Sequence, residues 1–373
     1  MRILIVSDVS SHMRGGVPTE TRGLIRGLSA RGHAVALASD TPLAGTEQAE
    51  HFPITLPVDA SLVSEIARAI GSFKPDFVHV ICMSSRGVNN LAPLLRTHRW
   101  ALTVHSVPPH ERKLAHWHGH ERLHYSARAM RFLANSVAWR WVLHSGMVPQ
   151  VIVHSRYVEG IVLKYGGRNV ASIPLPFEAE STAAVGERSG TSAPLLVSVA
   201  GLAHTKGQHD VLKAMPLLLA EFPGLLYQAI GEIRDHSYMD YLHRLARQLQ
   251  IEAHVKITPD LPHAEKEAAL TRAAVYVQPS HEEGFCLAFA EAAATVPRLV
   301  GTDTGAIAAI CLDDPGARVV PVRQPKALAS AVSELLRYRL PTDHMAQRAL
   351  RLSERFSFAG YVKAHEDLYA VRL

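Results

Sequence analysis

Residues 273–294 read AAVYVQPSHEEGFCLAFAEAAA, and this stretch decides the fold. A β-branched run at 275–277 leads through proline, serine and a Glu-Glu-Gly turn into an alanine-rich run at 285–294. Short β-branched runs bounded by turn residues predict strands, and alanine favours helix. We therefore predict a strand, a turn and a helix in succession, which is the repeating unit of parallel α/β sheets.

The same alternation extends in both directions along the chain. Further strands are predicted at 3–6, 35–38, 77–81, 101–104, 151–153, 195–199, 226–230, 255–257 and 299–300. Further helices are predicted at 19–30, 61–70 and 157–164, and from near Gly207, Ser237, Ala264 and Lys326. This rhythm over the whole length predicts two doubly wound α/β domains with parallel sheets.

A boundary between the two domains is visible in the composition. Residues 178–194, EAESTAAVGERSGTSAP, contain almost no large apolar side chain, as expected of an exposed linker. At about 150 residues per domain, a length of 373 residues also favours two domains. We place the first domain at 1–177 and the second at 195–340. Residues 341–373 are expected to form C-terminal helices, with packing back onto the first domain as one option.

Charge is distributed unevenly between the two halves. The chain has 39 Lys and Arg against 34 Asp and Glu, a formal charge of +5. Residues 1–182 hold 19 basic and 13 acidic residues, whereas the remainder holds 20 and 21. No zinc-finger spacing, basic zipper or aromatic RNA-binding signature accompanies this surplus, so the sequence disfavours nucleic acid as a partner. An anionic small ligand or an anionic surface fits better.

Cysteine usage and hydrophobic runs favour a cytoplasmic protein. Cys82, Cys286 and Cys311 form no CxxC pair, which argues against a disulfide framework and a structural zinc site. The N-terminal apolar run has only four residues before Ser7, too few for a signal peptide. No segment reaches the roughly 18 apolar residues that a membrane span needs.

Three loops at the predicted carboxyl ends of strands carry candidate binding residues. The first loop holds Gly15 and Gly16 ahead of a helix, where backbone N–H groups can cradle a phosphate; a simple tight turn is the alternative. The second holds Lys206 and Gly207 between a strand and a helix, where the ammonium can meet a diphosphate. A solvated surface lysine is the alternative there.

The third loop follows the strand at 275–277 and carries two carboxylates. Glu283 lies before the predicted helix and Glu291 lies on it, and two helical turns climb about 11 Å, so the pair could grip both ends of an extended nucleotide sugar. The N–H groups of 284–287 would stabilise an anion between them. A capping carboxylate with an unrelated surface glutamate is the alternative. Together the three loops predict a phosphorylated ligand in a cleft between the domains.

These residues resemble the retaining glycosyltransferases of family 4, whose GT-B architecture consists of two Rossmann-like domains facing an interdomain cleft. The resemblance runs from about residue 2 to residue 340. Its most specific part is the segment PSHEEGFCLAFAEAAA. The supporting parts are the Gly15-Gly16-Val17 loop, His105 after ALTV, the Lys206-Gly207 pair and the run VGTDTGAIAAI.

The resemblance implies transfer of a sugar from a nucleotide diphosphate sugar to a hydroxyl acceptor, which is a glycan, a lipid or a small natural product. Anomeric configuration would be retained, and no metal or other cofactor would be needed. His105 would contact the transferred sugar, Lys206 would neutralise the diphosphate and Glu283 would lie near the sugar hydroxyls. Glu291 would hold the ribose hydroxyls. The other donor-binding positions implied are Gly15, Gly16, Gly284, Phe285, Cys286 and Leu287.

Three positions depart from the family's pattern. Gly201 stands where an arginine is usual, with Arg14 and Arg298 as candidate substitutes. Cys286 stands where a glycine is usual, and Ala309 stands where a glutamate is usual. A second hypothesis is therefore a non-catalytic or regulatory relative that binds a nucleotide sugar. Another GT-B chemistry, sugar phosphorolysis or epimerisation, is a further alternative.

Residues 111–141 mix basic and aromatic side chains. One interpretation is a surface helix pair that meets an acceptor or the inner face of a membrane as a peripheral contact. Ordinary amphipathic helices whose aromatic residues face the core are the favoured alternative. The aromatic residues concerned are Trp117, Tyr125, Phe132, Trp139 and Trp141. Two further histidines at predicted strands, His79 and His154, are interpreted as structural.

Overall fold

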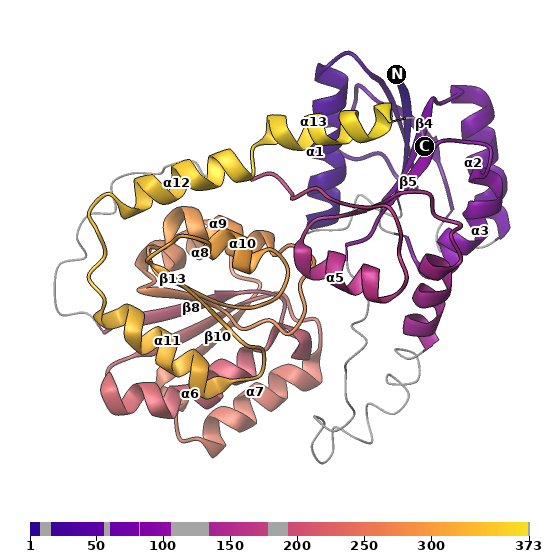
Figure 1. Cartoon of the computed structure of the whole chain (residues 1–373). Helices are drawn as coiled ribbons and strands as arrows, with labels where there is room; N and C mark the ends of the chain where they lie inside the picture. The colour runs from indigo at the N-terminus through magenta and orange to yellow at the C-terminus, as the bar shows by residue number, and fades with distance from the viewer. Residues whose placement is uncertain (8–15, 56–59, 82, 106–133, 178–192, 372–373) are drawn as a thin grey trace. The chain divides into compact units, whose positions relative to one another are not determined.

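The computed structural model describes residues 1–7, 16–55, 60–81, 83–105, 134–177 and 193–371. The chain forms two compact units, one made of Met1–Leu175 with Phe358–Leu373 and the other of Pro176–Ser357. In both units parallel strands alternate with helices (Figure 1). The prediction of two Rossmann-like domains with parallel sheets is confirmed.

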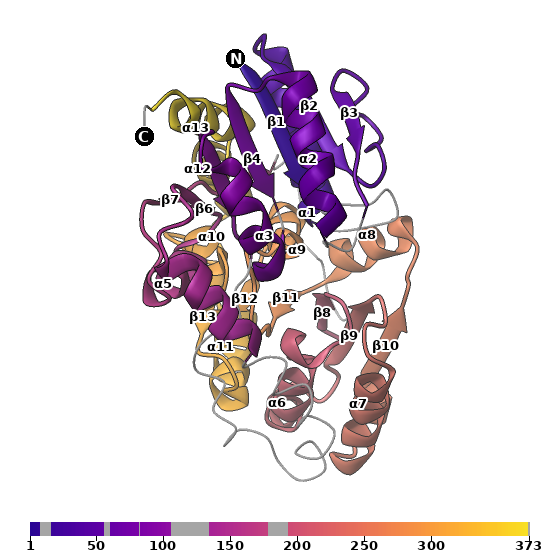
Figure 2. The same ribbon diagram turned by 90° about the vertical axis from the view of Figure 1, so that its right-hand side faces the viewer.

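The first unit is built on a seven-stranded sheet in the order β3-β2-β1-β4-β5-β6-β7 (Figure 2). Its strands are β1 (Arg2–Ser7), β2 (Ala34–Ser39), β3 (Glu50–Pro53), β4 (Phe77–Ile81), β5 (Trp100–Thr103), β6 (Val151–Val153) and β7 (Val170–Ser172). All of their pairings are parallel. The strand order reverses between β1 and β4, and in open α/β sheets ligands bind at such a point.

Helices cover both faces of this sheet, which explains why its central strands are mostly apolar. One face shares a core with α2 (Ala60–Phe73), α3 (Ser85–Leu95), a helix at 134–144 and α5 (Arg156–Lys164). The other face carries α1 (Gly16–Ala30) and α13 (Phe358–Ala370), which pack against each other. The Tyr369 ring of α13 lies on the Phe77 ring of β4, with centroids 4.4 Å apart.

The second unit is built on a six-stranded parallel sheet in the order β10-β9-β8-β11-β12-β13. Its strands are β8 (Leu195–Val199), β9 (Leu226–Gly231), β10 (Val255–Pro259), β11 (Val275–Gln278), β12 (Leu299–Thr302) and β13 (Ala317–Val320). Its α-helices are α6 (Gln208–Glu221), α7 (His236–Gln248), α8 (His263–Arg272), α9 (Leu287–Thr295), α10 (Ile307–Cys311), α11 (Pro325–Arg337) and α12 (His344–Arg355). The order reverses between β8 and β11, so the loops after these two strands flank the switch point.

The two C-terminal helices belong to different units. Helix α12 belongs to the second unit, where Arg348 is fully buried. The Arg348 guanidinium binds the Asp314 carboxylate and donates to the carbonyls of Val296 (2.6 Å) and Pro297 (2.8 Å). Helix α13 belongs to the first unit, so the chain passes twice between the units. In the described part of the chain no helix is both long and apolar enough to cross a membrane.

Candidate functional site

The loops after β8 and β11 are joined backbone to backbone in the second unit. Gly207, which precedes α6, has a left-handed backbone (φ 69°), and a Cβ there would lie 2.0 Å from the Pro279 carbonyl oxygen. Only glycine permits this approach without displacing the β11 loop. The His281 N–H also donates to the Thr205 carbonyl at 2.8 Å. The glycine next to Lys206 therefore fixes where that lysine stands against the β11 loop.

Two residues predicted to act on the donor form an ion pair at this junction. Lys206 Nζ lies 2.8 Å from Glu283 Oε1. Ser280 Oγ donates to the same oxygen at 2.7 Å. Burial lowers the pKa of Lys206, but the Glu283 carboxylate outweighs it and raises that pKa above its ordinary value. The lysine side chain as a whole keeps 29% exposure at the switch point.

The turn between Glu283 and α9 has an unusual backbone at Cys286. This residue precedes α9 and has φ 84° and ψ 67°, in the left-handed region that glycine adopts most easily. Its side chain is buried, and burial together with Glu283 raises the pKa of the thiol well above its ordinary value. The expected glycine would have suited this backbone, so the departure adds a neutral thiol at the start of the helix.

A glycine from the run VGTDTGAIAAI supports the same turn. A Cβ on Gly305 (φ 57°) would lie 2.7 Å from the Phe285 carbonyl oxygen and 2.8 Å from Glu283 Cβ. The next N–H, that of Ala306, donates to the Phe285 carbonyl at 2.8 Å. Phe285 is buried, whereas Gly284 and Leu287 are half-buried.

Helix α9 begins at Leu287, two residues later than the sequence suggested. The first N–H groups of the helix have no partner within it, as at any helix start. Glu291 is exposed on α9, and its carboxylate lies 3.9 Å from Lys266 Nζ of α8. Glu283 lies before the helix and Glu291 lies on it, as predicted, but residues 283–286 are not helical, so two helical turns do not separate the two carboxylates.

At Gly201, where the family usually has an arginine, the side chain of Arg234 from a neighbouring loop occupies the space. An ideal Cβ on Gly201 would lie 2.9 Å from Arg234 Cγ, so the Arg234 side chain crosses this position. Arg298 cannot substitute, because its guanidinium donates to the carbonyls of Leu335 (2.7 Å) and Tyr338 (3.2 Å). Arg14 lies outside the described residues, as does Gly15. Ala309 is exposed on α10.

A buried triad of His209, Asp210 and His281 lies next to this site, and the sequence analysis did not single it out. His281 Nε2 and Asp210 Oδ2 form a hydrogen bond of 2.7 Å, and His209 Nδ1 lies 2.9 Å from Tyr238 Oη. Burial raises the pKa of Asp210, but His281 outweighs it and lowers that pKa. Burial lowers the pKa of His209 to about 3. The triad links the start of α6 to the β11 loop.

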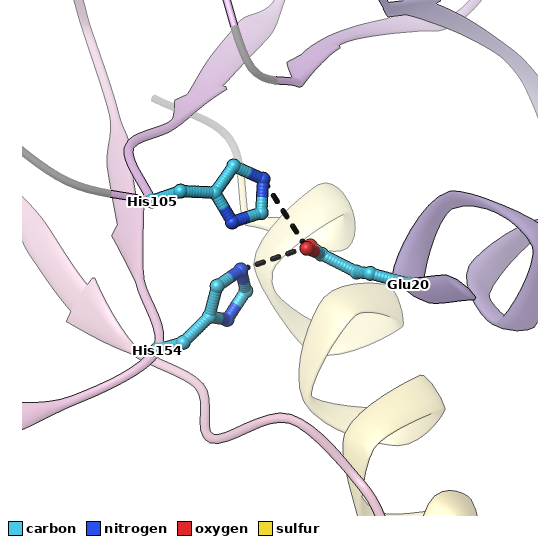
Figure 3. Close-up of side chains that lie close together, drawn as sticks. All are labelled: Glu20, His105 and His154. Carbon is cyan, nitrogen blue, oxygen red and sulfur yellow. Dashed lines mark ion pairs between the residues drawn. The ribbon is translucent and has the colours of Figure 1, made fainter. Parts of the chain in front are cut away.

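In the first unit, His105 belongs to a second triad that includes two residues with no predicted role in binding. His105 follows β5, His154 follows β6 and Glu20 lies on α1, with both rings directed at the carboxylate (Figure 3). His105 Nε2 lies 3.2 Å from Glu20 Oε2, and His154 Nε2 lies 2.9 Å from Glu20 Oε1. The Glu20 side chain is fully buried, and that of His105 is 18% exposed.

This triad lies in a polar layer beneath α1 and α13. Tyr369 Oη lies 2.6 Å from His79 Nδ1, and His79 Nε2 lies 2.7 Å from Thr103 Oγ1. Burial would raise the pKa of Glu20, but His105 and His154 lower it to about 2. Glu20 could have been noticed in the sequence, because it lies four residues before Leu24 and so shares the apolar face of its helix.

The remaining predicted positions are placed as follows. Gly16 starts α1, three residues earlier than the predicted helix. Within residues 111–141 only 134–141 are described; there Trp139 is buried in the core, and Trp141 is 56% exposed. Trp117, Tyr125 and Phe132 lie outside the described residues.

Comparisons with known proteins agree with the fold and the motifs. Residues 184–353 match the family described as Glycosyl transferases group 1, and residues 14–180 match Glycosyltransferase Family 4. The chain therefore belongs to the family 4 type of glycosyltransferases, as the sequence predicted.

Three relatives illustrate the range of similarity. Glycogen synthase of Mycobacterium tuberculosis is 31% identical over 184 residues, 49% of this chain and 44% of the relative. The match thus spans less than half the length of that relative. Sucrose-phosphate synthase from Thermosynechococcus elongatus superposes with a TM-score of 0.75 at 17% identity, covering 99% of this chain and 98% of the other. Anabaena HepE in complex with UDP-glucose gives 0.72 at 15% identity, covering both chains fully (100%). These structures confirm the GT-B fold.

Proposed function

We propose that this protein transfers a sugar from a nucleotide diphosphate sugar to a hydroxyl acceptor, with retention of anomeric configuration and without a metal at the diphosphate. The acceptor is a glycan, a lipid or a small natural product. The ion pair of Lys206 and Glu283 beside the start of α9 carries this proposal. The Lys206 ammonium and the N–H groups at the start of α9 would both stabilise a diphosphate bound at the switch point of the second sheet.

The electrostatics of the pair suit a leaving diphosphate. In the free protein Glu283 balances the charge of Lys206, and the lysine side chain as a whole stays partly exposed. A bound diphosphate would bring negative charge to the same ammonium and to the N–H groups at the start of α9. Because these donors are already fixed in position, little reorganisation would be needed as charge develops on the leaving group.

Other groups have proposed roles around the donor. Glu291 is exposed on α9, which leaves its carboxylate accessible to ribose hydroxyls. Arg234, which lies across Gly201, is the side chain we propose as the second phosphate cation in place of the missing arginine. His105 of the first unit is proposed to contact the transferred sugar. The structure of HepE with UDP-glucose supports a uridine diphosphate sugar as the first donor to test.

The test is calorimetric titration with UDP, GDP, ADP and dTDP, followed by the matching sugar nucleotides. We expect one of the four diphosphates to bind and Lys206→Ala to weaken its binding about 10- to 100-fold, the effect of losing a hydrogen bond to a charged group. Lys213→Ala is the matched control, because Lys213 lies on the exposed side of α6 and pairs only weakly with Asp210 (4.0 Å). The donor site would be disproved if none of the four diphosphates bound, or if both variants lost affinity equally.

Transfer is tested separately from binding. The donor that binds is incubated with acceptor sugars and lipids, and NMR of the product gives the configuration of the new bond. Retention is expected, and an inverted product would contradict the proposed mechanism.

A second candidate function is nucleotide-sugar binding without transfer. It is favoured by Cys286, whose buried side chain stands at the turn where the donor sugar is expected to pass. Tight binding of a sugar nucleotide with neither hydrolysis nor transfer would select this alternative. Release of a sugar phosphate when inorganic phosphate is added, or conversion of the donor to its epimer, would indicate one of the other GT-B chemistries.

A further inference from the structure

The triad of Glu20, His105 and His154 has the composition and spacing of a metal site. One oxygen of the carboxylate and one nitrogen of each ring all lie within 4.8 Å of one another. The three residues come from α1 and from the ends of β5 and β6, and their side chains converge on one point (Figure 3). Their rings and carboxylate belong entirely to the first unit.

Three of the polar atoms that face one another in the triad have no hydrogen-bond partner within the part of the chain that the structure describes. Glu20 Oε2, His105 Nε2 and His154 Nε2 are buried, and none has a hydrogen-bond partner among the described residues. The carboxylate lies 3.2 Å from His105 Nε2 and 2.9 Å from His154 Nε2, and its Oε1 also accepts a hydrogen bond from Tyr361 Oη at 3.5 Å. Buried polar atoms are nearly always satisfied, and a cluster of atoms that is not suggests a bound ion or water.

The hydrogen bond made by the His154 ring also favours a metal site. Its Nδ1 lies 2.7 Å from the Ile173 carbonyl oxygen, which can only accept, so Nδ1 carries a proton. When the ring is neutral its proton is on Nδ1, and the Nε2 lone pair is available to an ion bound between the ring and Glu20. A histidine that binds a metal through one nitrogen and donates the other N–H to a backbone carbonyl has this arrangement.

We propose that Glu20, His105 and His154 bind a divalent transition-metal ion, with zinc as the ion best suited to the site. Two imidazoles and one carboxylate form a recognised zinc ligand set that leaves one coordination position open. Magnesium and calcium are disfavoured because they prefer oxygen ligands alone. The open position would lie toward His105, the most exposed of the three side chains, where water or a hydroxyl group can enter.

The site is distinct from the metal-independent chemistry proposed for the donor. That proposal concerns the diphosphate and Lys206 in the second unit, whereas these ligands belong to the first. A bound ion would connect the first turns of α1 to the ends of two strands at once.

The experiment is a zinc-binding measurement on the full chain, purified without a metal-affinity tag and dialysed against a chelator. Calorimetric titration with zinc chloride near neutral pH, checked by elemental analysis after gel filtration, is expected to show one tightly bound zinc ion, with no binding of magnesium. Glu20→Gln and His154→Ala should each weaken zinc binding by more than the roughly 10- to 100-fold that loss of an outer-shell partner costs.

His281→Ala is the matched control, since it alters the other histidine-carboxylate triad and should leave zinc affinity unchanged. If Glu20→Gln does not fold, His105→Gln provides the same test at a partly exposed position. The proposal is overturned if the dialysed protein binds no zinc, or if zinc affinity is the same in wild type and in every folded variant of the three ligands. Loss of zinc in His281→Ala alone would move the site to the other triad and equally overturn it.

Discussion

Each unit of this protein contains a buried triad of two histidines and a carboxylate, and the two triads differ in how their polar atoms are satisfied. In the second unit Asp210 and His281 share a hydrogen bond of 2.7 Å, and Tyr238 lies against His209. In the first unit Glu20 Oε2, His105 Nε2 and His154 Nε2 have no hydrogen-bond partner in the described part of the chain. Residue types alone would rank both triads as metal sites, whereas hydrogen-bond geometry separates them.

The largest effect is expected from removing the carboxylate of the unsatisfied triad. Glu20→Ala should lower the free energy of unfolding of the metal-free protein by about 3–5 kcal/mol, because it leaves the buried His154, whose pKa Glu20 raises, without its counter-charge. Urea denaturation followed by circular dichroism measures this change. Glu334→Ala, which breaks an exposed pair with Arg318, is the control and should cost less than about 1 kcal/mol. If Glu20→Ala and Glu334→Ala lowered the free energy of unfolding equally, burial of the Glu20 carboxylate would not be the source of its stabilising effect.

A smaller loss is expected in the satisfied triad. Asp210→Ala should cost about 1.5–3 kcal/mol, because it removes a hydrogen bond to a charged group and leaves His281 Nε2 without an acceptor. The same denaturation experiment applies. If Asp210→Ala proved more costly than Glu20→Ala, the ranking of the two triads would be reversed.

The smallest effect concerns pH. Burial lowers the pKa of His209 from 6.5 to about 3, so between these values the unfolded chain binds a proton that the folded chain does not. Stability from this group is therefore complete above pH 6.5 and falls as the pH is lowered, by up to about 1.4 kcal/mol per pH unit. His209→Asn should show a shallower loss of stability than wild type when unfolding is measured at pH 6.5 and 5.5. If wild type and His209→Asn lost the same free energy of unfolding between pH 6.5 and 5.5, the lowered pKa of His209 would be refuted.

The sequence predicted the central strands well and the edges poorly. Strands β1 and β6 contain continuous apolar runs, and β4 is apolar except for the buried His79, because both faces of the sheet are covered. Strands β3 (EHFP), β7 (VAS) and β13 (ARVV) were missed, since each is short and lies at an edge of its sheet, where only one neighbour constrains its residues.

The candidate site was also predicted from the sequence only in part. Lys206 and Glu283 were both expected at carboxyl ends of strands, and the structure pairs them. The left-handed backbone of Cys286 was signalled only indirectly, by the glycine that is usual at this position, because cysteine itself seldom adopts it. The partnership of Glu20 with His105 and His154 was missed for another reason: the three residues lie far apart in sequence, and only the strand order brings them together.

Because α13 belongs to the first unit, that unit can be completed on the ribosome only after the second unit has been synthesised. Met1–Leu175 emerges before the second unit, whereas Phe358–Leu373, which completes the first unit and supplies Tyr369 over His79, emerges after it. The earlier unit must therefore wait, with one face of its sheet only partly covered, while the whole of Pro176–Ser357 is translated. A circular permutant that begins with 358–371 followed by residue 1 would remove this delay, and pulse-labelled translation would show the first unit becoming protease-resistant before the second.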